Sequence, residues 1–266
     1  RANAVQVGGT MIGFFTGGAG CLIVTGLFGR TTGILAVAAI VATGLALITL
    51  WREPPAQAVP SECGQASLAN VIRRPGAWLV LAIALLTAMG ASATFGLFKL
   101  FLVDQGWPIA RIGMLGLAGG VATIILGCGG SAWLIARVGL KPVLLASVAA
   151  LFASASIWTI LAVLNIPAML PVAAVAVVAG SIGSGGASVG AMTLAMRFAQ
   201  NGAQAGTDMT AVQSSRDVGE LGASSIAAAL AGSMGYGAAF LGSIGVCVVT
   251  LVTIAGWLRI DREEVQ

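Results

Sequence analysis

The sequence predicts an all-α fold, a polytopic helical bundle that spans a membrane. Charged residues make up 8% of the 266 residues and hydrophobic residues 58%, whereas soluble domains carry about 25% charged residues. The mean hydropathy is +1.00. Apolar runs of about 20 residues, long enough to cross a bilayer as a helix, recur along the whole chain. The eight expected spans are 4–26, 31–51, 77–101, 111–134, 142–163, 168–195, 209–232 and 238–258.

The distribution of Lys and Arg predicts the orientation, because cytoplasmic loops carry an excess of these residues. The opposite face would hold three of them, Arg30, Lys99 and Arg111. The cytoplasmic face would hold nine: Arg1, Arg52, Arg73, Arg74, Arg137, Lys141, Arg197, Arg259 and Arg262. Both ends of this chain and the Pro-containing linker are therefore expected in the cytoplasm, with the helices in the inner (cytoplasmic) membrane and in contact with its lipid.

The composition also excludes several classes of function. The chain has no His, so it has no imidazole base, His metal site or His proton relay. Its four Cys are scattered without a CxxC pair, and there is no DxxD pattern. No Gly-rich phosphate loop ending in GK[ST] occurs, so an ion gradient would have to supply the energy for transport. We expect neither an enzyme nor a nucleic-acid binder, and no metal or cofactor.

The seventh expected span carries three charges close to its centre. Each costs about 2.5–3.5 kcal/mol at the middle of a lipid-facing helix. The polar residues follow spacings of 3, 1, 3 and 4, one stripe of a helix, and are Gln213, Arg216, Asp217, Glu220 and Ser224. One interpretation is an internal lock in which Arg216 pairs with Glu220 one turn on. The other is a site that binds substrate or protons, the default role of ionisable groups in membranes.

Glycines at four-residue spacing mark the first span, where Gly9, Gly13 and Gly17 would let another backbone approach closely. Gln6 continues the same face towards the cytoplasm. The fourth span has a similar glycine content, with Gly116, Gly120, Gly127 and Gly130. Tight packing alone explains these residues, and packing that slides during a conformational cycle is the alternative. We expect the glycine faces of these two spans to meet.

A repeat organises the chain. The tripeptide Ala4-Val5-Gln6 recurs as Ala211-Val212-Gln213, 207 residues later, at the same place near the start of a span. The interval holds six spans, so both copies would insert in the same direction, as in a parallel six-span repeat. We expect residues 1–51 to be the last two helices of a first half, 52–76 a cytoplasmic linker and 77–266 a complete six-helix second half. About four helices are then expected upstream.

At this point the chain resembles the major facilitator superfamily, of which a 6+6 parallel repeat is characteristic. The turn after the fourth span, AWLIARVGLK from Ala132 to Lys141, is similar to the family's cytoplasmic loop motif of Gly, Asp-Arg, Gly and basic residues. Ala132 replaces the glycine and Ala136 the aspartate. Arg137, Gly139 and Lys141 match the motif, and the resemblance implies a gating role for them. As residues of a cytoplasmic loop they are equally explained by membrane orientation.

Three stretches resemble the branch that contains the muropeptide permease and the rhizobactin and pyochelin siderophore permeases. They are NAVQ from Asn3 with Gly9 and Gly13, FKLFLVDQG from Phe98 with Ile112-Gly113, and AGTDMTAVQ from Ala205 with Gly235-Tyr-Gly237. The resemblance implies a secondary transporter, a proton-coupled importer of a small polar metabolite, with a ferric siderophore favoured. A muropeptide or other small-molecule permease, or a non-transporting scaffold, is the alternative. We expect a monomer.

The resemblance also implies alternating access around a central site, lined here by the third and sixth spans. The sixth span offers Ser181, Ser184 and Ser188 on one face, as substrate ligands or as small packing residues. Lys99, near the outer end of the third span, either reaches the membrane interface or attracts an anionic substrate. Asp217 or Glu220 would exchange the coupling proton.

Overall fold

The computed structural model describes residues 9–10, 13, 16–50, 67–200 and 204–263. Within these ranges the regular structure is entirely helical. Before the linker come η1 (Thr16–Gly20), α2 (Cys21–Phe28) and α3 (Arg30–Leu50). After it come α4 (Leu68–Arg73), α5 (Ala77–Asp104), α6 (Ile109–Ala122), η2 (Thr123–Gly130), α7 (Ser131–Val138), α8 (Leu140–Val163), α9 (Leu170–Gln200), α10 (Ala205–Met234) and α11 (Tyr236–Glu263). The expected all-α class is confirmed for the described residues.

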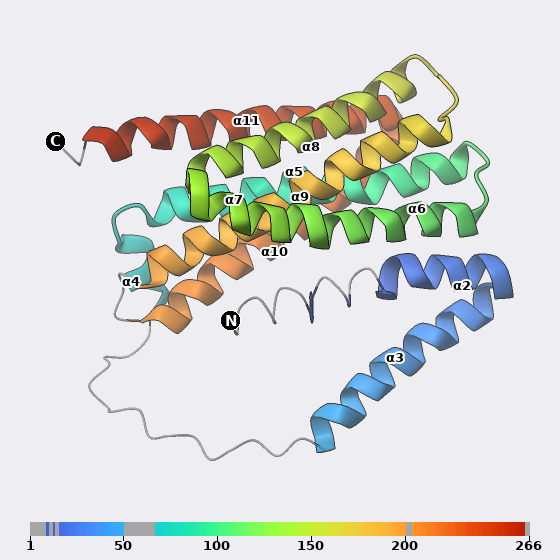
Figure 1. Cartoon of the computed structure of the whole chain (residues 1–266), viewed down its shortest axis with the longest axis horizontal. Helices are drawn as coiled ribbons and strands as arrows, with labels where there is room; N and C mark the ends of the chain where they lie inside the picture. The colour runs from blue at the N-terminus through green and yellow to red at the C-terminus, as the bar shows by residue number, and fades with distance from the viewer. Residues whose placement is uncertain (1–8, 11–12, 14–15, 51–66, 201–203, 264–266) are drawn as a thin grey trace.

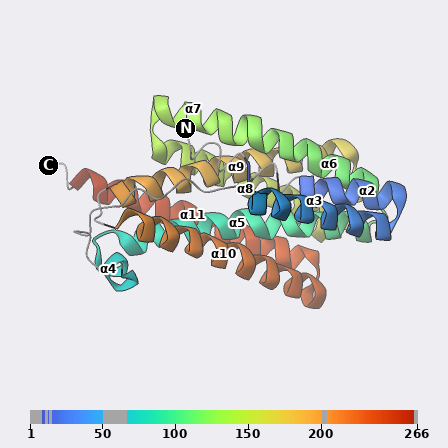
Figure 2. The same ribbon diagram turned by 90° about the horizontal axis from the view of Figure 1, so that it is seen from below.

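The long helices after the linker pack side by side into one bundle (Figure 1). α5 contacts α9, α10 and α11, and α8 contacts α9 and α11. α6, η2 and α7 follow one another as a single rod against α9, and Figure 2 shows α10 on the other side of the bundle, next to α5 and α11. Side chains at one end of the bundle form an aromatic core around Trp158, which is fully buried, stacks on Phe98 and Phe240, and meets Phe101 edge-on.

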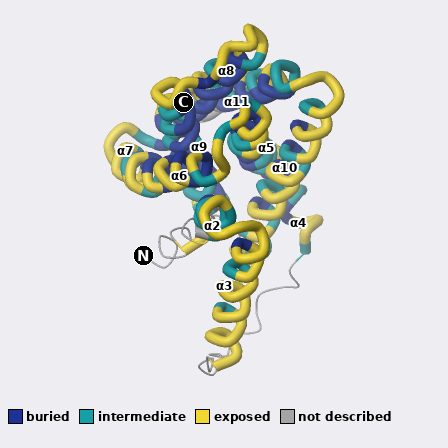
Figure 3. Tube along the Cα trace, turned by 90° about the vertical axis from the view of Figure 1, so that its right-hand side faces the viewer, coloured by how far each residue is buried: buried dark blue, intermediate teal, exposed yellow. Residues whose placement is uncertain are grey.

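The two helices before the linker lie at the side of this bundle. α2 packs on α6, and α3 packs on α2 and then diverges from the rest (Figures 1 and 3). α3 has a mean hydropathy of 2.4, yet Gly33 is its one buried residue. An apolar helix that buries so little of itself suits a hydrocarbon environment, where a spanning helix satisfies its own backbone.

Six helices of the described part are long and apolar enough to cross a membrane. They are α3, α5, the rod from Ile109 to Val138, α8, α9 and α11 up to Gly256. The first and the seventh expected spans are not among these six, each for a different reason. The first is described only in part, and its apolar helix covers Gly17–Phe28. α10 has 30 residues but carries the charged stripe. The total of eight spans therefore remains a prediction.

The first and fourth expected spans do meet, but through other residues than the sequence suggested. A Cβ added to Gly113 of α6 would lie 2.8 Å from Ile23, and one added to Gly116 would lie 3.3 Å from Ala19. Gly9, Gly13 and Gly17 have no described neighbour within 4 Å of such an atom. The expectation that both glycine faces form this contact is thus wrong for the first span, where Ala19 and Ile23 supply the contact.

Farther along the same rod, the glycines pack on a different helix. An added Cβ at Gly127 of η2 would lie 2.9 Å from the Cα of Gly185 on α9. Small residues, here a pair of glycines, permit so close an approach of two helix backbones. The rod adopts π-helical geometry over Thr123–Gly130, around this crossing, and π segments within α-helices are frequent at functional sites.

Candidate substrate and proton site

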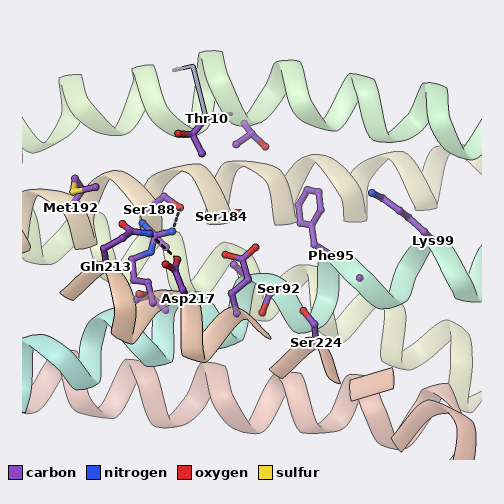
Figure 4. A pocket seen from close by; sticks show the side chains of 18 residues that line it. Thr10, Ser92, Phe95, Lys99, Ser184, Ser188, Met192, Gln213, Asp217 and Ser224 are labelled. Atoms are coloured by element: carbon purple, nitrogen blue, oxygen red, sulfur yellow. Dashed lines mark hydrogen bonds between the residues drawn. The ribbon is translucent and has the colours of Figure 1, made fainter. Parts of the chain in front are cut away.

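A cavity of about 500 Å³ opens among the helices of the bundle (Figure 4). Most of its wall comes from α5, α9 and α10, and η2 adds Thr123. Thr10 of the first expected span closes another side. The lining residues of α5 are Thr87, Ala88, Ala91, Ser92, Phe95, Gly96 and Lys99, and those of α9 are Ser184, Ala187, Ser188 and Met192. The volume lies within the range of small-molecule sites, about 300–1,000 Å³.

All five residues of the polar stripe of α10 line this cavity. They are Gln213, Arg216, Asp217, Glu220 and Ser224. The opposite side of α10 explains their direction, because it lies directly against α5. Ser215 Oγ donates a hydrogen bond to the carbonyl oxygen of Leu81 at 3.0 Å. A Cβ added to Gly219 would lie 2.5 Å from the carbonyl oxygen of Leu85. This close backbone contact turns the charged side of α10 towards the cavity.

The charged side chains form two separate contacts rather than one ion-pair cluster. Gln213 Nε2 donates a hydrogen bond to Asp217 Oδ1 at 2.8 Å, within α10. Arg216 donates to Ser188 Oγ on α9 at 3.2 Å. Neither Asp217 nor Glu220 forms an ion pair with Arg216 within 4.0 Å, although both interact with it electrostatically. The pairing of Arg216 with Glu220, on which the lock interpretation depends, is therefore not made in this conformation.

The three candidate serines of α9 differ in their surroundings. Ser184 and Ser188 line the cavity. Ser181 does not, because α6 crosses α9 at that level and a Cβ added to Gly119 would lie 2.9 Å from its hydroxyl oxygen. The Ser181 side chain is fully buried, and its hydroxyl has no hydrogen-bond partner among the described residues. Ser181 thus lies at the contact between α6 and α9 and outside the cavity lining, which agrees with the packing alternative.

Lys99 lies on the cavity wall at the far end from Gln213 and Asp217, with Phe95 between them (Figure 4). Its Nζ is 6.0 Å from the ring centroid of Phe98, the outer limit of a cation–π contact. The side chain is half-buried. Gln6, another candidate from the sequence, lies outside the described residues.

The loop residues Arg137, Gly139 and Lys141 lie where α7 meets α8, away from the cavity-lining set. Arg137 is exposed, and its guanidinium carbon stacks 4.0 Å over the ring of Trp133. Gly139 has φ of +91°, a backbone conformation that side chains disfavour, and its N–H donates to the carbonyl oxygen of Ile135. Glycine is thus needed for the turn between the two helices, whatever the basic residues do.

The sequence did not reveal the contacts that tie the linker to the bundle. Arg74, just after α4, forms an ion pair with Asp208 in the first turn of α10. Gln204 accepts a hydrogen bond from the N–H of Ser67 and donates one to its carbonyl oxygen, both at 2.9 Å. One signal could have suggested the ion pair: Asp208 and the basic pair Arg73–Arg74 are both expected at the same end of the helical bundle.

A second contact that the sequence did not indicate lies where α5 ends and α11 begins. The hydroxyl of Tyr236 donates to Asp104 Oδ2 at 2.6 Å and so joins the end of α5 to the start of α11. As for metals, no group of three His, Cys, Asp or Glu side chains gathers anywhere in the described ranges.

Comparison with known proteins gives a family. No curated protein matches the chain. The model of the Major Facilitator Superfamily matches residues 1–224, which is most of the sequence and includes α5, α9 and the charged stripe of α10. Members of this family are multi-pass membrane proteins that move small molecules by secondary transport and are not typically enzymes. With the helical bundle and its polar cavity, this match shows that the chain belongs to the major facilitator superfamily.

Proposed function

We propose that the protein is a proton-coupled importer of the inner membrane whose substrate is a ferric siderophore. The observation that carries the proposal is the stripe of Gln213, Arg216, Asp217 and Glu220, which lines a central cavity instead of packing against a neighbouring helix. Ionisable groups are costly within a membrane, and they persist where they bind substrate or exchange protons. With no phosphate-binding loop in the sequence, a proton gradient is the energy source that this chemistry favours.

Asp217 and Glu220 are the proposed proton acceptors. Both carboxylates lie next to Arg216, whose guanidinium donates instead to Ser188 on another helix. A change in the distance between α9 and α10 would alter the surroundings of both carboxylates. That is the behaviour that alternating access requires of a coupling site.

The siderophore is the finer part of the proposal, and its support is the resemblance of three stretches to siderophore permeases. The cavity wall agrees with a polar organic ligand, since hydroxyl groups of Thr87, Ser92, Ser184 and Ser224 accompany its charged residues. The organisation into halves is also proposed: residues 1–51 would belong to one half and residues 77–266 to the other. We assign gating at the cytoplasmic side to Arg137, Gly139 and Lys141.

The experiment uses the full-length protein in proteoliposomes with an imposed proton gradient. Uptake of ferric pyochelin labelled with radioactive iron is measured with and without a protonophore. Accumulation that the protonophore abolishes supports a proton symporter. Failure to take up ferric pyochelin or ferric rhizobactin under any gradient would overturn the siderophore assignment.

The coupling residues are tested in the same vesicles by Asp217→Asn and Glu220→Gln. For the residue that couples protons, the variant should exchange substrate in counterflow yet fail to accumulate it. Ser225→Ala is the matched control, because Ser225 lies on α10 outside the cavity and donates only to the carbonyl oxygen of Leu221. If both carboxylate variants accumulate substrate like the parent, neither residue couples protons.

A further inference from the structure

The cavity has a second charged end, at which Lys99 is the one charged residue among those the structure describes. The acidic residues that line the cavity in the described part of the chain are Asp217 and Glu220, and both belong to α10. No carboxylate lies within 4.0 Å of Lys99 Nζ among the described residues. Asp104, the acidic residue nearest in the sequence, accepts a hydrogen bond from Tyr236 and does not line the cavity.

The register of α5 against α10 gives the separation of the two ends. Ser215 contacts Leu81 and Gly219 contacts Leu85, so the two helices run in the same direction with a constant offset of 134 residues (215 − 81 and 219 − 85). Glu220 therefore lies at the level of residue 86. Lys99 is 13 residues farther along α5 (99 − 86), which corresponds to about 20 Å at 1.5 Å per residue. Asp217 is farther still.

An unpaired ammonium in this position needs a partner. Lys99 precedes the end of α5 by five residues (104 − 99), close enough for its side chain to reach the interface. Its side chain instead lines the cavity (Figure 4) and is half-buried. Burying a charged group without a counter-charge is unfavourable. An anionic group of the ligand would supply that counter-charge, because neither carboxylate of α10 lies within 4.0 Å of the ammonium in this conformation.

The wall of α5 between the two ends combines apolar and hydroxyl side chains. Ala88, Ala91, Phe95 and Gly96 lie between the level of Glu220 and that of Lys99, and so do the hydroxyls of Thr87 and Ser92. The Phe95 ring meets Phe98 edge-on at 5.8 Å between centroids, which fixes one aromatic surface near the ammonium. Small residues on either side leave room for a ring or an apolar chain against this surface.

We propose that Lys99 is the anion-binding residue of the cavity and that the substrate is an organic anion with an aromatic or apolar body. This inference rests on the proposed transport function and names the substrate class for the same cavity. The backbones at Lys99 and at the level of Glu220 lie about 20 Å apart along the bundle, and the side chains cover part of that distance, so a ligand that contacts only the Lys99 end leaves Asp217 and Glu220 uncontacted. Substrate and proton then act on different ends of one cavity, and their coupling passes through the helices. Siderophores that carry a carboxylate and an aromatic ring belong to this class.

The test measures binding without a gradient, so its outcome is independent of proton coupling. The full-length protein is purified in detergent, and its thermal unfolding is followed with increasing naphthoate, an aromatic carboxylate, or naphthamide, its neutral isostere. A ligand that binds the folded protein raises the unfolding temperature in proportion to its affinity. We expect naphthoate to bind the parent more tightly than naphthamide does.

Substitutions of Lys99 test whether the carboxylate of naphthoate binds at this residue. Lys99→Gln should weaken naphthoate about tenfold, the loss of one charge-assisted contact, and Lys99→Glu should weaken it further. Lys99→Arg should retain most of the affinity, and naphthamide should bind all of them alike. Arg111→Gln is the matched control, because Arg111 is an exposed cation at the same side of the membrane, stacked 5.9 Å from the Trp107 ring and outside the cavity.

Two results would overturn the inference. One is a Lys99→Gln variant, with the parent's unfolding temperature in the absence of probe, that still binds naphthoate like the parent. The other is a parent protein that does not prefer naphthoate over naphthamide. If naphthoate binding depends on Lys99 while proton-driven uptake of ferric siderophores fails, the result supports the anion site and contradicts the proposed function.

Discussion

Arg74 and Asp208 form an ion pair across 134 residues of sequence and thereby fasten the segment before α5 to the first turn of α10. The Asp208 side chain is fully buried, and the Arg74 side chain is 22% exposed. Arg74 also donates to the carbonyl oxygen of Phe198 at 2.7 Å, and its guanidinium carbon lies 4.0 Å over the Phe198 ring. One arginine thus joins the end of α9 and the start of α10 to the segment that leads into α5.

Replacing Asp208 by Leu should destabilise the protein. The second carboxylate oxygen of Asp208 has no hydrogen-bond partner among the described residues, so Arg74 is the main compensation for its burial. Removing one member of a buried ion pair costs about 3–5 kcal/mol, and we expect the lower end because Arg74 keeps some contact with water. The measurement is thermal unfolding in one detergent, with Arg73→Gln as the exposed neighbouring control.

The double variant Arg74→Met with Asp208→Leu isolates the interaction. Because it leaves no unpaired charge, it should be more stable than Asp208→Leu alone. An Asp208→Leu variant as stable as the parent would show that the ion pair does not hold this end of α10.

Residue spacing and charge were sufficient to predict much of the architecture. A polar stripe on a helix follows from local periodicity, so the five residues were sufficient to predict one polar side of α10, which lines the cavity in the structure. Contacts between helices depend on how residues far apart in the sequence are brought together. The ion pair of Arg74 and Asp208 is of this kind, and so is the burial of Ser181 beneath Gly119.

Glycines show the same limit. Their spacing predicts that a backbone comes close, but every glycine lacks a side chain in the same way, and the sequence does not say which neighbour arrives. Gly113 packs against Ile23, Gly127 packs against Gly185, and Gly13 has no described residue next to it. Lys99 is similar, because the reach of its side chain suits both the interface and the cavity.

Substituting Gly219 by Ala should disturb the orientation of the charged stripe. The added methyl group would lie 2.5 Å from the carbonyl oxygen of Leu85, so α10 must shift away from α5. We expect a loss of stability of about 1–3 kcal/mol from overpacking and weaker proton-driven accumulation. Gly222→Ala is the control, since Gly222 lies on the same helix with open space around it. Equal behaviour of the two variants would show that the contact between α5 and α10 tolerates this displacement.

Bulk at Gly113 should separate the first and fourth expected spans. Gly113→Leu places a side chain against Ile23 and the backbone of Ala19, so transport should fall while membrane insertion is retained. Gly13→Leu meets no described neighbour and should affect the folded protein less. Uptake per molecule of inserted protein, determined in the same vesicles, gives the comparison. Normal transport by Gly113→Leu would contradict a functional contact between these spans.

Variants of Ser188 should show whether the charged stripe couples protons or only holds the helices together. In this conformation Ser188 Oγ accepts the hydrogen bond of Arg216 at 3.2 Å and so connects α9 to α10. Ser188→Ala removes that acceptor and leaves Arg216 with only the carboxylates of its own helix. If Arg216 must alternate between Ser188 and the carboxylates, accumulation should fall at least several-fold while counterflow persists, and Ser188→Thr should restore accumulation because the hydroxyl returns.

Ser156→Ala is the control, because the Ser156 hydroxyl bonds only to the carbonyl oxygen of Phe152 on α8. A lock would behave differently: Ser188→Ala would lower the unfolding temperature and reduce accumulation and counterflow by the same factor.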